Sequence, residues 1–146
     1  MINGATNATA TVAAGTNPVA VAVNPASNKV YVANSGSNNV TVIDGANNST
    51  TTVAAGNSPQ AVAVNPATNK IYVPNSSSSN VTVIDGATNG TTTVPAGALP
   101  RAVAVNATTN KIYVLNFGSN DVTVIDGATN ATSTVTVGSI PVALEV

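Results

Sequence analysis

The chain has 146 residues, of which only 6% are charged, and it carries a net charge of −1 at pH 7. It has no Cys, His or Trp, so no disulfide, no Cys/His metal site and no Cys/His catalytic dyad can form. Its four cationic side chains are too few to follow a nucleic-acid backbone, and no apolar run approaches the roughly 20 residues of a membrane-spanning helix. We therefore expect no nucleic-acid partner, no membrane insertion, no metal and no cofactor.

A repeat of 41 residues organises the whole chain. Prolines recur at this interval, and Gly, Lys, Tyr and Asp keep the same spacing; the prolines are Pro18, Pro59, Pro100 and Pro141. The units cover about residues 16–56, 57–97 and 98–138, with partial repeats 1–15 and 139–146, and together they form one domain, 1–146. A period of roughly 40 to 45 residues is typical of stacked repeats such as propeller blades.

Each full unit predicts four short strands. In the first unit they cover residues 19–23, 29–33, 40–44 and about 50–54. These runs are rich in Val, Ile, Thr and Tyr, and Asn-Pro, Ser-Gly and Asp-Gly separate them. No window has an apolar period of 3.6 residues, so we expect helix content near zero.

The two ends predict incomplete units. Residues 1–4 align with residues 42–45, so the chain starts within the end of a third strand and continues into a Thr-rich fourth strand. A last inner strand is expected at residues 142–146.

Short connections make neighbouring strands antiparallel, so each unit is a four-stranded meander. Its second and third strands are apolar on both faces, and such a sheet must be covered on both faces. Stacking one unit on the next provides that cover. We therefore predict an all-β, propeller-type array of four-stranded antiparallel blades, with about three complete blades and partial end strands. The small residues of the first strand suit the inner edge, and the Thr-rich fourth strand suits the outer rim.

Two segments carry a family resemblance. The strings NKIYVPN at 69–75 and NVTVIDG at 80–86 resemble the YVTN-family β-propeller repeat. The likeness extends over essentially the whole chain. It implies a propeller fold and, since members are often extracellular or surface-layer proteins, an extracellular or cell-surface location. Family members commonly close rings of seven blades, and this chain is much shorter.

The small number of units leaves three interpretations of the assembly open, because a propeller typically needs four to eight blades to close. The chain is part of a longer protein, or an open stack whose ends join other copies, or a ring made by about two chains. Exposed strand edges recruit partners, so we expect copies to associate through the terminal strands.

A lysine and an aspartate recur in each unit. The expected hairpin places them opposite each other as Lys29 and Asp44, Lys70 and Asp85, and Lys111 and Asp126. We interpret them as structural cross-strand pairs. A Ca²⁺ site would need several carboxylates together. The Asp-Gly steps are expected to shape the turn after the third strand, with Gly at positive φ.

Glycosylation and partner contact are the remaining candidate roles. Several Asn residues begin N-x-S/T triplets, and six of them at recurring positions are possible glycan acceptors: Asn7, Asn48, Asn89, Asn130, Asn39 and Asn80. Four residues depart from the repeat and are possible contacts for a partner, either a peptide or a glycan: Gln60, Arg101, Phe117 and Glu145.

No nucleophile with a matching base and orienting group is evident, so we assign no catalytic residue and expect a protein that is not an enzyme. The leading hypothesis is an extracellular structural or surface protein that self-assembles or belongs to a larger propeller. The alternative is a binding module that presents loops to a peptide or glycan.

Overall fold

The computed structural model describes residues 1–2 and 4–145. Over these residues it contains twelve strands in three four-stranded antiparallel sheets. Each sheet is one blade, and its strands follow one another in chain order. The predicted all-β, propeller-type fold is confirmed. The helical content of the described chain is one 3₁₀ turn, Ser76–Ser78.

The first blade consists of β1 (Pro18–Asn24), β2 (Lys29–Asn34), β3 (Asn39–Asp44) and β4 (Thr50–Ala54). The second consists of β5 (Ala63–Asn65), β6 (Lys70–Asn75), β7 (Asn80–Asp85) and β8 (Thr91–Pro95). The third consists of β9 (Pro100–Asn106), β10 (Lys111–Asn116), β11 (Asp121–Asp126) and β12 (Thr132–Thr136).

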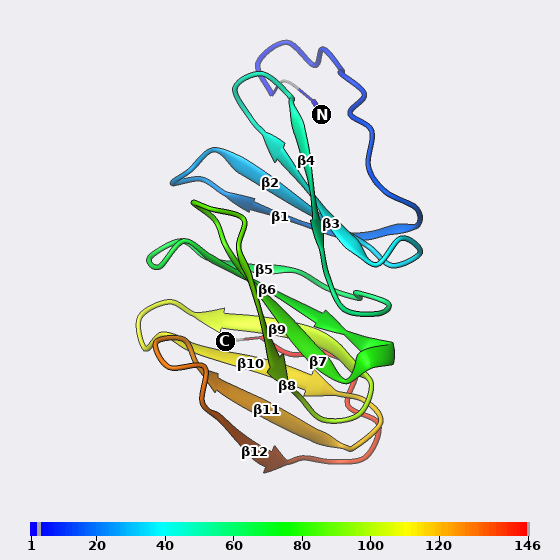
Figure 1. Cartoon of the computed structure of the whole chain (residues 1–146), viewed down its shortest axis with the longest axis vertical. Helices are drawn as coiled ribbons and strands as arrows, with labels where there is room; N and C mark the ends of the chain where they lie inside the picture. The colour runs from blue at the N-terminus through cyan, green and yellow to red at the C-terminus, as the bar shows by residue number, and fades with distance from the viewer. Residues whose placement is uncertain (3, 146) are drawn as a thin grey trace.

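The blades are stacked face to face in chain order, with the first blade at one end and the third at the other (Figure 1). We call the face of a blade that points to the following blade its front face, and the opposite face its rear face. The front face of the first blade buries Tyr31, Val42 and Val53 against Ile71 and other rear-face residues of the second. The second and third blades repeat this packing, with Tyr72 against Ile112. Burying these apolar side chains between sheets drives the stacking.

The second blade has a shortened inner strand. Pro74 stands where the other blades have Ala33 and Leu115, and it has no N–H to donate to a neighbouring strand. Strand β5 pairs with β6 over only three residues, whereas β9 pairs with β10 along its length. The Pro74 carbonyl still accepts a hydrogen bond from the backbone N–H of Gln60, at 3.0 Å, which keeps the chain beside the blade.

The expected terminal strands are not formed. A single bridge between Ile2 and Thr9 stands where a strand pair was expected, and it matches the Ile43–Thr50 pair one repeat later. Residues 142–145 lie in no strand, and position 146 lies outside the described residues. A strand needs a hydrogen-bonded neighbour, and the described chain supplies no second strand of the blade beside either terminal segment.

Asparagine makes most of the turns. Within each blade, the turns carry a left-handed residue at a fixed repeat position; these residues include Asn28, Asn69 and Asn110 in the first turn and Asn48, Asn89 and Asn130 in the third. Asn adopts positive φ more readily than most other non-Gly residues. In the described chain no Gly has positive φ, so the expectation for the Asp-Gly turns was wrong. Gly is needed there for space, since a β-carbon at Gly86 would lie 2.3 Å from Asn69 Oδ1.

Candidate functional site

Neighbouring blades are joined by a repeated set of polar contacts, which we call the inter-blade ladder. Lys29 Nζ donates to the Gly86 carbonyl at 2.7 Å, and Lys70 Nζ donates to the Gly127 carbonyl at 3.0 Å. The donor and acceptor are 57 residues apart in both cases. Each lysine therefore reaches forward to the blade that follows its own, and the same contact forms at both junctions.

Asparagines add a second rung. Asn24 Nδ2 donates to Asn69 Oδ1 at 2.7 Å, and Asn65 Nδ2 donates to Asn110 Oδ1 at 2.9 Å. Both donors are fully buried. Buried polar groups are stabilising only when they are hydrogen-bonded, so these pairs fix how one blade sits on the next.

The recurring lysines and aspartates are opposite each other in the strand register, but they form an ion pair in one blade of the described chain. Lys111 Nζ lies 2.8 Å from Asp126 Oδ2, with 40% of the lysine side chain exposed. In the first two blades the ammonium bonds to the next blade's Gly carbonyl instead. Lys29 and Asp44 are thus cross-strand neighbours in register, as are Lys70 and Asp85, without the ion pair that Lys111 and Asp126 form.

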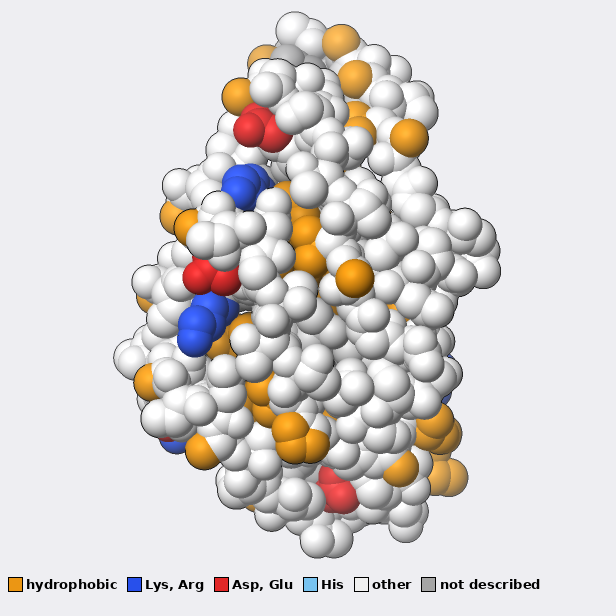
Figure 2. Space-filling view, viewed as in Figure 1, with side chains coloured by type: hydrophobic (Ala, Val, Ile, Leu, Met, Phe, Trp, Pro, Cys, Tyr) orange, Lys and Arg blue, Asp and Glu red, His pale blue; other side chains and the backbone are white. Residues whose placement is uncertain are grey.

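The aspartates cap the turn that follows the third strand of each blade. Asp85 Oδ1 accepts hydrogen bonds from the backbone N–H of Ala87 and of Thr88, and these hold its pKa below the usual range. The pKa of Asp126 is also lowered, first by the hydrogen bond from Lys111 and then by the N–H groups of its own turn. Both carboxylates are thus structural acceptors at neutral pH. Figure 2 shows acidic and basic side chains alternating down one side of the stack.

The end faces of the stack expose several valines whose repeat equivalents are buried or partly buried in the internal junctions. At one rim position, Val53 and Val94 are 5% and 2% exposed, whereas Val135 on the front face of the third blade is 52% exposed. On the rear face of the first blade, Val21 and Val23 are 64% and 58% exposed. Their repeat equivalents Val62, Val64, Val103 and Val105 pack in the internal junctions. A hollow of about 260 Å³ lies on the rear face of the first blade, lined by Pro18, Val19, Ala20, Val21 and Val32.

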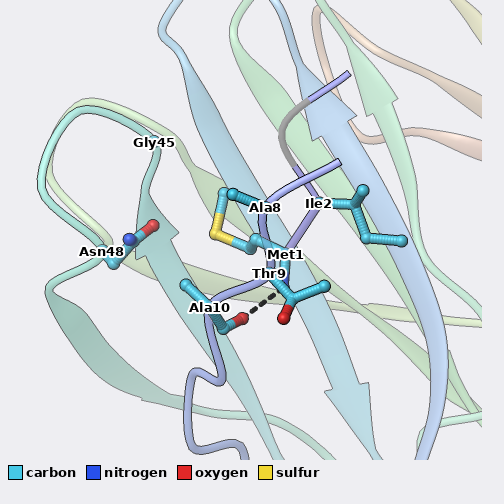
Figure 3. Close-up of a pocket in the computed structure, with 7 residues that line it drawn as sticks. All are labelled: Met1, Ile2, Ala8, Thr9, Ala10, Gly45 and Asn48. Atoms are coloured by element: carbon cyan, nitrogen blue, oxygen red, sulfur yellow. Dashed lines mark hydrogen bonds between the residues drawn. The ribbon is translucent and has the colours of Figure 1, made fainter. Parts of the chain in front are cut away.

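Part of that rear face is covered by the start of the chain. Met1, Ile2 and residues 8–10 lie beside Gly45 and Asn48 around a pocket of about 330 Å³ (Figure 3). Met1 and Ile2 are themselves 48% and 74% exposed.

Three of the four residues expected to contact a partner come together. Gln60, Arg101 and Phe117 line a pocket of about 240 Å³ with Ser76 and Leu99. The Arg101 guanidinium lies 5.2 Å from the centroid of the Phe117 ring, which is within the range of a cation–π contact. Glu145 is exposed and is not among the residues that line this pocket.

The six candidate glycan acceptors differ in their surroundings. Asn39 and Asn80 begin strands, and their Oδ1 atoms accept hydrogen bonds from Asn34 and Asn75. The other four are left-handed turn residues, of which Asn7 and Asn48 are exposed; Asn89 and Asn130 are half-buried. An enzyme would reach the exposed pair most easily.

Two common functional features are absent from residues 1–2 and 4–145. No three His, Cys, Asp or Glu side chains lie close enough together to hold a metal ion. None of the helical structure in this part of the chain has the length and apolarity required to span a bilayer.

Comparison with models of known protein families gives no match. Comparison with curated proteins likewise finds no similar sequence.

Solved structures do resemble this one. Hydrazine synthase from Kuenenia stuttgartiensis aligns with a TM-score of 0.79 at 23% identity, over 95% of this chain and 40% of its own. A putative 6-phosphogluconolactonase from Bacteroides fragilis aligns with a TM-score of 0.70 at 20% identity, over 89% of this chain and 42% of its own. The dihydro-heme d1 dehydrogenase NirN aligns with a TM-score of 0.71 at 20% identity, over 82% of this chain and 28% of its own.

These neighbours are propeller-type folds, and the chain spans less than half the length of each. At such identities the likeness establishes the fold alone. The chain is accordingly a propeller-type array of three stacked blades.

Proposed function

We propose that the chain is a non-enzymatic structural protein of the cell surface or extracellular space, which acts by stacking its blades with further blades of the same kind. The observation that carries this proposal is the exposure of Val135, at a position where Val53 and Val94 are almost fully buried. An apolar face built to be covered, but open to water, is a binding surface for another blade.

The resemblance of the sequence repeat to the YVTN-family repeat supports the surface location, because proteins of that family are often surface-layer proteins. The carboxylates Asp44, Asp85 and Asp126 occupy turns of three different blades, so they do not gather into an acid–base pair. The enzyme names among the structural neighbours belong to proteins that are 20–23% identical to this chain, and they bear on its fold.

Light scattering over a series of concentrations tests the structural role. We expect the mass to rise above that of one chain as concentration increases, and negative-stain images to contain regular rings or rows of blades. A particle with the mass of a single chain at all concentrations would refute the proposal. Intact-mass measurement of protein from its natural source tests the surface location through attached glycan, with Asn48 as the first site to map.

A second candidate function is the binding of a peptide or glycan in the pocket beside Arg101. The cation–π pair with Phe117 supports it, since a guanidinium stacked on a ring presents both a charge and a flat apolar surface. A glycan or peptide array probed with the chain and with Phe117→Ala tests this candidate. A ligand retained by the chain and lost by the variant would support it, and equal binding to both would refute it.

A further inference from the structure

The inter-blade ladder is directional. At both internal junctions the earlier blade donates from its front face, through a lysine and an asparagine, and the later blade accepts on its rear face, through a Gly carbonyl and an asparagine side chain. The two ends of the stack therefore differ in chemistry: one end holds donors and the other holds acceptors.

The donor end is the front face of the third blade. Lys111 takes the repeat position of Lys29 and Lys70, and its ammonium donates a hydrogen bond to Asp126 of the same blade. Asn106 takes the position of Asn24, yet it is only half-buried where Asn24 is fully buried. Next to these donors the apolar part of the face includes Tyr113, which is half-buried, whereas Tyr31 and Tyr72 are fully buried at the internal junctions.

The acceptor end is the rear face of the first blade. Gly45 takes the position of Gly86 and Gly127, and it is half-buried where they are buried. Asn28 is exposed, while Asn69 and Asn110, at the same position in the other blades, are half-buried and receive hydrogen bonds. The exposed Val21 and Val23 complete this face.

From this complementarity we infer that a second copy of the chain docks head to tail, with the front face of its third blade on the rear face of the first blade. Lys111 then leaves Asp126 and donates to the Gly45 carbonyl of the other copy, and Asn106 donates to Asn28. The inference rests on the proposed structural role and specifies the partner and the polarity of its contact. The expected association through the terminal strands stays a separate prediction.

Docking requires the terminal segments to move aside. The described residues at the start of the chain, 1–2 and 4–10, are exposed and include the bridge of Ile2 with Thr9 and the hydrogen bonds between Met1 and Ala10; residues 142–145 form no strand. The new junction repeats one that the chain already forms twice. A contact between unlike faces cannot close on itself as a two-fold dimer, so it continues as a row or closes as a ring.

Two single substitutions test the polarity, one at each end. Val21→Asp places a carboxylate on the rear face, and Val135→Asp places one on the front face; both positions are more than half exposed, so the fold is retained and circular dichroism verifies it. We expect each variant alone to sediment as a single chain. An equimolar mixture should form a one-to-one dimer and nothing larger, because one intact front face and one intact rear face remain.

A second pair of variants tests the ladder. Lys111→Gln removes the ammonium donor, and we expect it to weaken the association about tenfold or more, as for the loss of a charge-assisted hydrogen bond. Asp126→Asn is the matched control: it removes the ion pair that competes for Lys111 within the chain but leaves the donor, so association should be at least as strong as in the unaltered chain.

The outcomes separate this inference from the proposed function. If the unaltered chain is a single particle at every concentration, both are refuted. If it associates, but the Asp variants still associate alone or their mixture forms no dimer, the head-to-tail contact is refuted while self-association stands. Equal effects of Lys111→Gln and Asp126→Asn would refute the role of Lys111.

Discussion

The three rim valines provide a direct test of blade stacking, because Val53, Val94 and Val135 share one repeat position and differ in what covers them. Replacing Val94 by Ala removes two methyl groups from a side chain that is 2% exposed. At about 0.8 kcal/mol for each buried carbon, with a further cost for the cavity, the free energy of unfolding should fall by about 2 kcal/mol. Val53→Ala, at 5% exposure, should cost about as much.

Val135→Ala removes the same atoms from a side chain that is 52% exposed, and no cavity is left. Its cost should remain under about 1 kcal/mol. Urea unfolding followed by circular dichroism measures the difference. With a slope of about 2 kcal/mol per molar urea, the midpoint should shift by roughly 1 M for the first two variants and by less than half of that for the third. The measurement is made on dilute protein, where copies do not cover Val135. Equal shifts for all three would refute face-to-face stacking as the source of stability.

Three further expectations follow from the turns and polar contacts. Gly97→Ala should destabilise the chain by roughly 1 to 3 kcal/mol, because its β-carbon would lie 2.4 Å from Ser119 Oγ, whereas Gly138→Ala, with nothing within 4 Å, should be tolerated in a thermal melt. Asn75→Ala should cost about 1 to 3 kcal/mol in urea unfolding, since it removes the two side-chain hydrogen bonds that this fully buried residue donates to Asn80 Oδ1 and Thr82 Oγ1. Asp126 has a lowered pKa in the fold, so its contribution to stability is complete above the unfolded pKa of about 4 and is lost as the pH falls. Asp126→Asn should therefore have a shallower loss of melting temperature between about pH 5 and pH 2, and an unchanged slope would contradict this.

The strands could be predicted closely, because local composition and the repeat both determine them. The run expected at residues 29–33 is the strand Lys29–Asn34, and the run expected at 40–44 is Asn39–Asp44. The terminal strands were predicted wrongly, because a repeat pattern records only that a segment resembles a strand. Whether the strand forms depends on a neighbour with which it can exchange hydrogen bonds.

The hydrogen bonds between blades could not be predicted from the sequence as closely as the strands. Lys29 and Asp44 are opposite in register, as the hairpin implies, but the lysine bonds to Gly86 in another blade. A pairing rule for a single hairpin cannot predict this hydrogen bond, because the Gly86 carbonyl comes close to Lys29 only when the blades stack. The signal was nonetheless in the repeat: a Gly follows every one of the recurring aspartates, and an Asn precedes each recurring lysine.

The positive-φ asparagines explain a compositional feature that sequence alone associates with glycosylation. Asn48, Asn89 and Asn130 occur where the backbone is left-handed, so the turn requires them whether or not a sugar is attached. The N-x-S/T triplet arises there because the Thr-rich strand β4, β8 or β12 begins two residues later.

The identical junctions also make the length of the chain adjustable. Removing one whole unit, residues 57–97, would bring Lys29 to the Gly127 carbonyl and Asn24 to Asn110, with the donors and acceptors of an ordinary junction. Duplicating a unit would add a junction of the same kind. Gene duplication or deletion in steps of one unit could therefore lengthen or shorten such a protein without designing a new interface, and an engineer could do the same.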